Sequence, residues 1–338
     1  MKVLRFSHVI AAAGAAALLT IAAQAQATTI AFMRAGPDPF YQYGMKAAEM
    51  AAKDLGVDMV TYAANNSSTQ ELANIQDAIT KGVDGILIYA VSLSSERAAI
   101  AQANRANVPI FFQYGYDPSL LDKVAGFMQI NVNTFGIPVG EYVGKHVPEG
   151  EVAIVTGKLG RGDAEAYAKG FREGLKKSGS KAKVVADVPA DWNRQKALNA
   201  TAQILTAHPD LKALYIENDD MAVGASIAIA RADKTDQVLL ASGTNGAPYG
   251  LALIKEGKMA LSYANPPSSA SVMALRLLLG VIDKKVEPGH YYNAPSKLIT
   301  KANLDQAEPW NPTPEQVKAW LKKPLAKPVI PAPGQKKN

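Results

Sequence analysis

Short apolar segments of strand type alternate with longer helical patterns along most of this chain. The first such segment, residues 29–33, is followed by a Gly-Pro-Asp-Pro loop and a helical spacing of apolar residues that ends at Gly56. Further strands are expected at 57–62, 85–88, 108–112 and 124–128, with a helix at 94–106. Ser68 and Glu71 have the spacing of a capping box at the start of another helix. Such alternation predicts an α/β fold with helices on both faces of a parallel sheet.

The same pattern then starts again. Strands are expected at 152–155, 183–188, 213–216, 238–241 and 259–263, with helices between them. Two successive sets of similar size predict two similar lobes. Because open α/β sheets bind ligands beyond the carboxyl ends of their strands, the predicted site is a cleft between the lobes. A helix at 268–282 and a strand at 297–300 would let the chain cross between the lobes again.

The first 27 residues have the pattern of a secretion signal. Lys2 and Arg5 precede an apolar stretch over 9–23, and Ala25-Gln26-Ala27 is a small-x-small cleavage site. The apolar stretch is short for a membrane span. The sequence contains no cysteine, which excludes disulfides and a lipid anchor on an N-terminal Cys. We therefore expect a soluble protein exported to the periplasm, with its mature chain starting near Thr28.

The net charge of +6 does not indicate a nucleic-acid partner. Two of the positive charges leave with the predicted signal, and residues 322–338 carry five lysines and no acidic residue. The remaining body is about neutral, which makes it a poor polyanion binder. The segment 322–338 is also rich in proline and is interpreted as a disordered extension.

The motifs of common enzyme classes are missing. The loop at 34–39 lacks the glycines of a dinucleotide site, and neither a Walker A motif nor a Gly-x-Ser-x-Gly elbow occurs. The four histidines are scattered, so no metal site is expected. We accordingly predict no cofactor and no enzymatic activity.

One glycine-rich loop, residues 157–163, lies between a predicted strand and a predicted helix. Its backbone amides, with Lys158 and Arg161, could hold an anionic group. A flexible connection with solvated charges explains the same residues, and isolated glycine-rich loops are weak motifs. The second interpretation is favoured.

Several motifs in one order resemble the type I periplasmic sugar-binding proteins of ABC importers, in particular the ribose-binding-protein-like group. The resemblance covers residues 28–300, and its motifs lie at 39–41 (Pro-Phe-Tyr), 71–77, 190–194 (Ala-Asp-Trp-Asn-Arg), 205–210 and 218–225. It implies two Rossmann-like lobes with parallel sheets, joined by a three-stranded hinge, with the ligand cleft between them.

The implied organisation is a signal peptide (1–27), a first lobe (28–130 with 266–295), a second lobe (131–265 with 296–310) and a Pro/Lys-rich tail (311–338). The resemblance also implies a protein that closes around one small ligand and delivers it to the membrane permease of an ABC transporter. A chemoreceptor that reads the closed form is a further partner that the resemblance leaves open.

The family's ligand positions carry over to polar and aromatic residues of this sequence. They are Asp38, Phe40, Tyr41, Tyr89, Gln113 or Tyr114, Asn131, Trp192, Asn218, Asn245 and Asn265. Aromatic faces from opposite lobes can sandwich the C–H faces of a carbohydrate, and amides, a carboxylate and phenols can pair with its hydroxyls.

Three departures from the family pattern bear on the ligand. Sugar binders of this family usually carry an Arg, an Asp-Arg pair and an Asp where this sequence has Tyr167, Tyr114-Gly115 and Asn245. Neutral groups thus replace charged ones. This puts ribose in doubt and favours a small uncharged pentose, hexose or alditol.

Three alternatives remain at this point. An effector domain of a sugar-responsive transcription regulator would have a helix-turn-helix where this chain has its predicted signal. A binder in the same fold could instead take a furanosyl signalling compound, an acid or a phosphorylated species held by Lys158 and Arg161. An exported α/β enzyme has no motif in its favour.

Overall fold

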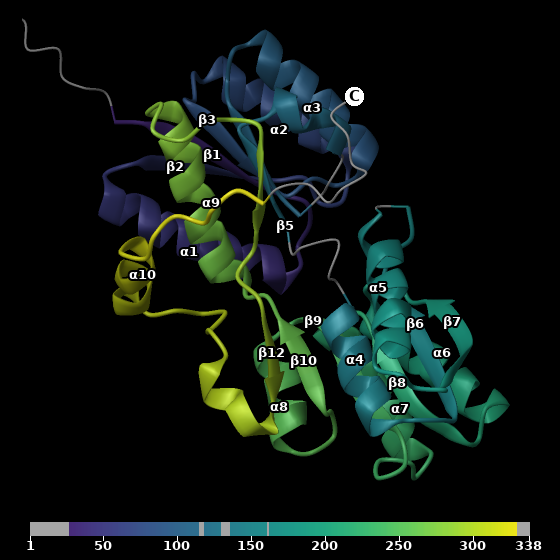
Figure 1. The fold of residues 1–338 in the computed structure, drawn as a ribbon. Helices are drawn as coiled ribbons and strands as arrows, with labels where there is room; N and C mark the ends of the chain where they lie inside the picture. Colours follow the sequence, from purple (N-terminus) through teal and green to yellow (C-terminus); the bar gives the residue numbers. More distant parts are fainter. Residues whose placement is uncertain (1–26, 115–117, 130–135, 161, 330–338) are drawn as a thin grey trace, which may run out of the picture.

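The computed structural model describes residues 27–114, 118–129, 136–160 and 162–329, and it forms two lobes, each built on its own sheet (Figure 1). The sheet of the first lobe has the order β11-β5-β4-β3-β1-β2, and every neighbouring pair in it is parallel. Its strands are β1 (Thr29–Arg34), β2 (Asp58–Ala63), β3 (Gly85–Ile88), β4 (Ile110–Gln113), β5 (Gly126–Gln129) and β11 (His290–Asn293). Its helices are α1 (Pro39–Leu55), α2 (Ser68–Thr80), α3 (Leu93–Arg105), the short η1 (Pro118–Lys123) and α9 (Pro267–Ile282).

The second lobe repeats this plan with the order β12-β10-β9-β8-β6-β7, in which only the β10–β12 pair of the described strands is antiparallel. Its strands are β6 (Glu151–Thr156), β7 (Lys183–Pro189), β8 (Leu211–Ile216), β9 (Leu239–Asn245), β10 (Leu261–Ala264) and β12 (Lys297–Thr300). Its helices are α4 (Ile137–His146), α5 (Asp163–Lys177), α6 (Arg194–Ala207), α7 (Asp219–Arg231), α8 (Pro248–Lys255) and the short η2 (Lys301–Gln306). The predicted α/β fold of two lobes is confirmed.

Alternating side chains of the strands explain why helices cover both faces of each sheet. In β1, Ile30 and Phe32 pack in a core with α1 and α9, whereas Ala31 and Met33 pack in a separate core with α2 and α3. All four side chains are fully or almost fully buried. A strand buried on both faces is apolar along its whole length, as expected in a parallel sheet between two helical layers.

The chain passes between the two sheets from β5 to α4, from β10 to α9 and from β11 to β12. These passages agree with the hinge that the resemblance implies. The first runs through residues 130–135, which lie outside the described part of the chain. The proposed lobe boundaries at 130, 265 and 295 fall in or next to these passages.

The C-terminal segment forms more structure than its composition suggests. Helix α10 (Pro314–Leu321) packs against α1 and α9 of the first lobe, and it buries Val317 and Trp320. The prediction of a disordered extension from residue 322 is wrong for residues 322–329. Arg276 donates to the carbonyl of Lys323, and Pro328 forms a β-bridge with Tyr292. These contacts give partners to backbone groups that amino-acid composition alone would assign to solvent. The predicted signal (residues 1–26) and residues 330–338 lie outside the described part.

The predicted capping box of α2 is also wrong. The N-cap is Ser67, whose hydroxyl accepts from the amide of Gln70 at 3.2 Å. The Glu71 carboxylate is buried and accepts instead from the amide of Val91 at 2.7 Å. Glu71 thus fixes the loop that follows β3 rather than the start of its own helix.

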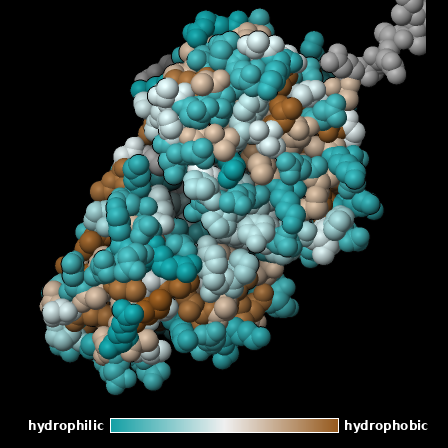
Figure 2. All heavy atoms as spheres, turned by 180° about the vertical axis from the view of Figure 1, so that it is seen from behind, coloured by the Kyte–Doolittle hydropathy of each residue, from teal (hydrophilic) through white to brown (hydrophobic). Residues whose placement is uncertain are grey.

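Hydrophilic residues cover most of the face shown in Figure 2, and hydrophobic ones lie on it in scattered groups. The large exposed apolar side chains of the described residues, Leu55, Leu159, Ile227 and Leu325, lie in different parts of the chain. None of the helices in the described ranges is long and apolar enough to cross a bilayer.

The packing of α10 predicts that Trp320 stabilises the first lobe. Trp320 is only 7% exposed, so Trp320→Ala should lower the free energy of unfolding by about 3–5 kcal/mol through lost contacts and the cavity left behind. The exposed Lys318 of the same helix provides the control, and Lys318→Ala should change it by less than about 0.5 kcal/mol. Urea denaturation of both variants measures the difference, and equal stabilities would show that α10 does not pack as described.

Candidate ligand-binding cleft

A cleft of about 620 Å³ lies between the lobes and is lined by loops from both sheets. Its residues follow the carboxyl ends of β1, β2, β3 and β4 in one lobe and of β6, β7, β8 and β9 in the other. This is where the topology of parallel sheets places ligands. The volume is that of a small-molecule pocket.

The first lobe contributes the start of α1 to the cleft. Asp38 is the N-cap, and its Oδ1 accepts from the amide of Phe40 at 2.8 Å. The rings of Phe40 and Tyr41 follow directly, and they meet edge to face with centroids 5.8 Å apart. Phe40 also meets Tyr114 edge to face at 5.3 Å. The helix cap and the three aromatic rings thus form one wall of the cleft. Pro39 at the first helical position fixes the backbone between Asp38 and Phe40.

The second lobe contributes Trp192, whose indole lies against the backbone of Gly157. A Cβ atom at position 157 would overlap the six-membered ring of the indole. Asp191 and Trp192 both have left-handed backbone conformations, with φ of 54° and 60°. Non-glycine residues adopt this region at a cost, and such strain is concentrated at functional sites.

Asn218 is the N-cap of α7 and lines the cleft at the same time. Its Oδ1 accepts from the amide of Met221 at 2.8 Å. That bond leaves the Nδ2 amide as the part of the side chain that can serve a ligand. Asn218 therefore has a structural role beside the predicted binding role.

Asn265 joins the two lobes at the passage from β10 to α9. Its Nδ2 donates to the Tyr114 hydroxyl at 3.1 Å, and its Oδ1 accepts from the amide of Asn245 at 2.5 Å. Tyr114 belongs to the first lobe and Asn245 to the second. Asn245 has a φ of 95°, and this bond helps to hold its strained backbone. The three residues form a polar link at the hinge side of the cleft.

The structure places two predicted site residues behind the cleft lining. Tyr89 is buried and donates through its hydroxyl to Ser271, which in turn donates to Oε1 of Gln113. Both side chains turn toward α9 because this chain of hydrogen bonds satisfies them there. Tyr89 still supports the site, since its ring packs against those of Phe40, Tyr41 and Tyr114. Asn131 lies outside the described residues.

The predicted residues that do line the cleft are Asp38, Phe40, Tyr41, Tyr114, Trp192, Asn218, Asn245 and Asn265. Sequence reasoning missed the aromatic residues Tyr249 and Trp310 as cleft residues and named Tyr167 only as a departure from the family pattern. All three line the cleft. Tyr167 meets Trp192 edge to face, with centroids 6.2 Å apart. No local pattern marked these residues as part of a binding site. Tyr249 simply follows a proline, and Trp310 lies after residue 300, where the family resemblance ends.

Charges in the described lining are predominantly negative. The acidic residues are Asp38, Asp163, Asp191 and Asp220, and the basic ones are Lys158 and Lys196. The ammonium group of Lys196 lies 2.5 Å from Asp191, and Arg194, just outside the lining, lies 2.6 Å from Asp220. Desolvation raises the pKa of Asp38, the amide of Phe40 opposes this, and the Asp220 carboxylate raises the pKa further. A second negative charge near Asp38 makes the cleft unfavourable for an anion.

Three glycine amides of the glycine-rich loop are already paired. Gly157 donates to a carboxylate oxygen of the buried Glu217 at 2.6 Å. Gly160 and Gly162 donate to the two carboxylate oxygens of Glu165 at 2.7 and 3.1 Å. Arg161 lies outside the described residues, and Lys158 is exposed. The protein's own carboxylates thus occupy three of the amide donors that an anionic ligand could use.

A buried carboxylate supports the second-lobe side of the cleft. Asp219, next to Asn218, accepts from the amide of Ala247 at 2.6 Å and from the hydroxyl of Ser262 at 2.8 Å. These bonds tie the start of α7 to the loop after β9 and to β10. Burial outweighs the hydrogen bonds and raises the pKa of Asp219 to about 6.

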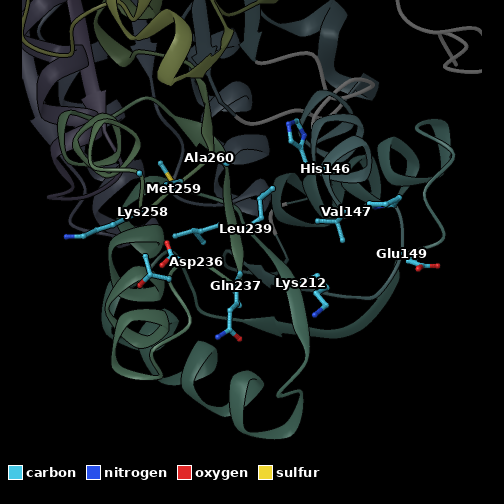
Figure 3. Close-up of a pocket in the computed structure, with 15 residues that line it drawn as sticks. His146, Val147, Glu149, Lys212, Asp236, Gln237, Leu239, Lys258, Met259 and Ala260 are labelled. Atoms are coloured by element: carbon cyan, nitrogen blue, oxygen red, sulfur yellow. The ribbon is translucent and has the colours of Figure 1, made fainter.

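A second hollow of about 460 Å³ lies in the second lobe beside the amino ends of β8, β9 and β10, at the sheet edge opposite the cleft, and Figure 3 shows its lining. Its polar side chains come from different elements and do not converge: Lys258 and Glu149 lie at opposite ends of it (Figure 3). Among the described residues, no cluster of His, Asp or Glu could hold a metal ion. The interlobe cleft is the better candidate site because its polar and aromatic groups face one space.

Comparison with known proteins agrees with this geometry. Residues 11–285 match the model of the periplasmic binding protein domain family. The chain belongs to the periplasmic binding protein family. It is 30% identical over 268 residues to a ribose import binding protein of Salmonella typhimurium, which covers 79% of this chain and 88% of that protein. It is 31% identical over 271 residues to the D-allose-binding periplasmic protein of Escherichia coli, covering 78% and 86%.

A solved structure shows the same fold. It is an ABC transporter periplasmic solute binding protein from Actinobacillus succinogenes with bound D-allose, and it superimposes with a TM-score of 0.77 at 24% identity. The match covers 82% of this chain and 99% of that one. The predicted resemblance to sugar-binding proteins of ABC importers is confirmed.

The contact between Gly157 and the Trp192 indole predicts a coupled loss of function. Gly157→Ala should displace the indole and weaken ligand binding at least tenfold, as should Trp192→Ala. Because Gly157→Ala acts through the ring that Trp192→Ala removes, the double variant should bind no more weakly than Trp192→Ala alone. Isothermal titration calorimetry gives the three affinities. Additive losses would show that Gly157 acts independently of the indole.

The raised pKa of Asp219 predicts a pH-dependent stability. With a pKa of about 6 in the folded protein and the ordinary value near 4 when unfolded, the folded state binds the proton more tightly. The resulting stabilisation is complete below about pH 4 and lost as the pH rises past 6, an effect of about 3 kcal/mol.

Chemical denaturation between pH 4 and 7.5 tests this in the wild-type protein and in Asp219→Asn, which cannot titrate. The stability difference between the two should change with pH in that direction. A difference that stays constant across the range would contradict the assignment.

Proposed function

We propose that this protein captures a small neutral carbohydrate or alditol in the interlobe cleft and delivers it to the membrane permease of an ABC transporter. It acts in the periplasm as a soluble binding protein after removal of its signal peptide, and it is not an enzyme. A chemoreceptor that reads the closed form would be a second partner of the same state.

The observation that carries this proposal is the composition of the two cleft walls. Phe40, Tyr41 and Tyr114 of the first lobe and Trp192 and Tyr167 of the second provide aromatic faces on both sides. Such faces suit the C–H surfaces of a sugar or polyol. The uncharged amides and hydroxyls between them can pair with ligand hydroxyls, and a site built in this way rejects analogues that leave its groups unpaired.

An anionic ligand is less compatible with this cleft. Four carboxylates against two ammonium groups line its described part, and Glu165 and Glu217 occupy amides of the glycine-rich loop. A neutral ligand also agrees with the names of two relatives, a ribose import binding protein and a D-allose-binding periplasmic protein. Tyr114, Tyr167 and Asn245, where the family usually has charged partners, favour a ligand other than ribose.

The mechanism follows from the division of the site between lobes. A ligand touches all of its contacts only when both walls approach it, so it stabilises the closed arrangement over the open one. The residues of the hinge side, with Asn265 at their centre, stay in contact with both lobes. The closed form then presents the surface that the permease recognises.

A thermal-shift screen tests the proposal directly. D-ribose, D-allose, xylitol and myo-inositol are compared with ribose 5-phosphate and gluconate. At least one neutral compound should raise the melting temperature by several degrees at 100 times its Kd, equivalent to about 2.7 kcal/mol. A shift with the anions alone would favour an anionic ligand, and turnover of any compound would favour an enzyme.

The cap of α7 allows a variant that separates binding from folding. Asn218→Asp keeps an oxygen for the Met221 amide but replaces the cleft-facing donor with an acceptor. It should retain the melting temperature of the unliganded protein and weaken binding of the best neutral ligand at least tenfold. Thr313→Asp, at the N-cap of α10 and outside the cleft lining, is the control for added charge at a helix cap. Unchanged affinity in Asn218→Asp would remove Asn218 from the binding site.

A further inference from the structure

The C-terminal part of the chain passes once more between the lobes, after the passages of the hinge. Segment η2 packs against β12 and α8 of the second lobe, and α10 packs against α1 and α9 of the first. The connecting residues 307–313 therefore run from one lobe to the other along the side of the molecule, where Figure 1 shows the yellow trace between η2 and α10. In the middle of this segment, Trp310 lines the cleft and is only 2% exposed.

Trp310 contacts aromatic residues of both lobes. Its ring meets Phe40 of the first lobe edge to face with centroids 5.6 Å apart, and Tyr249 of the second lobe at 6.2 Å. Edge-to-face pairs of this kind add to the stabilisation given by burial. Phe40 and Tyr249 both line the cleft, so one indole is packed against a cleft residue of each lobe.

Hydrogen bonds of Trp310 show the same division. Its indole Nε1 donates to the carbonyl of Asn245 in the second lobe at 3.1 Å. Its own carbonyl accepts from the hydroxyl of Ser268 at the start of α9 in the first lobe. The backbone of Asn245, with its φ of 95°, is therefore held from one side by Asn265 and from the other by Trp310.

Neighbouring contacts hold the segment in place on both sides of Trp310. The ammonium group of Lys46 on α1 donates to the side chain of Asn311 at 3.1 Å, and Lys323 pairs with Glu308 at 2.7 Å. On the second lobe, Asn303 of η2 donates to the carbonyl of Leu298 in β12 at 3.0 Å. The position of the indole is thus set by both lobes.

We propose that Trp310 is a positioning residue of the ligand cleft, which holds Phe40 and Asn245 in their binding geometry and links the two lobes. The proposal rests on the proposed function of the cleft for its effect on affinity. The contacts of the indole are divided between the lobes, so its position depends on how the lobes lie against each other.

Affinity measurements on four proteins test the positioning role. The ligand is the neutral compound of the screen that binds the wild type most tightly. Trp310→Ala should weaken binding at least tenfold, and Trp310→Phe, which keeps a ring but loses the N–H donor, should bind with intermediate affinity. Trp320→Ala, which removes the other tryptophan of this chain end, should keep the wild-type Kd although it is less stable.

Wild-type affinity in Trp310→Ala, or an equal loss in Trp320→Ala, would overturn the positioning role. Trp310→Phe keeps the test decisive if the alanine variant does not fold. The ratio of affinities for D-allose and xylitol should also change in Trp310→Phe, because a general loss of stability would lower both affinities equally.

Hydrogen exchange of the unliganded protein tests the link between lobes without a ligand. Trp310→Phe and Trp310→Ala should speed exchange both at the start of α1 in the first lobe and in α8 in the second. Trp320→Ala should speed it in the first lobe alone. Unchanged exchange in α8 of the Trp310 variants would overturn the link. If no compound binds the wild type, the proposed function fails, and this experiment still decides whether Trp310 joins the lobes.

Discussion

The site depends on the way two parallel sheets present their carboxyl ends to one space. Every strand of such a sheet ends at the same edge, so the loops that follow these strands come together without any specific attraction between them. In this protein, the loops after β1 and β4 bring Phe40 and Tyr114 to one wall, and the loop after β7 brings Trp192 to the other. The chemistry of the cleft is then decided by which side chains these loops carry.

Several residues in and near the cleft are in conformations or surroundings that destabilise the folded state, and other contacts must compensate for this. Tyr114, Asp191, Trp192 and Asn245 all have positive φ values, and Asp219 beneath them is a fully buried carboxylate. Backbone strain and buried charge persist only where surrounding contacts determine them. Here the two hydrogen bonds of Asn265 hold Tyr114 and Asn245, and the donors to Asp219 stabilise the buried carboxylate. The rigidity of the walls is therefore obtained by polar bonds in addition to the apolar cores.

The sequence predicted the fold well because its signals are local and repeated. Apolar segments of strand type, such as residues 85–88, are unambiguous when helical patterns flank them. Most of the predicted cleft residues came from the family resemblance and follow strand ends, so topology places them in the cleft. Tyr89 and Gln113 follow strand ends too, but their side chains turn toward Ser271 on α9, a partner more than 150 residues away in sequence. Such a long-range hydrogen bond has no local pattern.

Trp310 and α10 were missed for a related reason. The prolines and lysines after residue 322 are typical of solvent-exposed positions. The contacts that order this segment are made by its backbone carbonyls, which accept from Arg276 on α9. The binding and lobe-linking roles of Trp310 stay proposals. What the structure adds is the path of the chain, which no residue type in this segment reveals.

The path of this segment restricts how far the two lobes can move apart. A stretch from residue 306 to residue 314 cannot reach farther than roughly 30 Å even when fully straightened. It is a tether between the lobes, attached to the second lobe through η2 and to the first through α10. The segment therefore sets an upper limit on how far the lobes can separate on this side, and the opposite side of the cleft has no such limit from it.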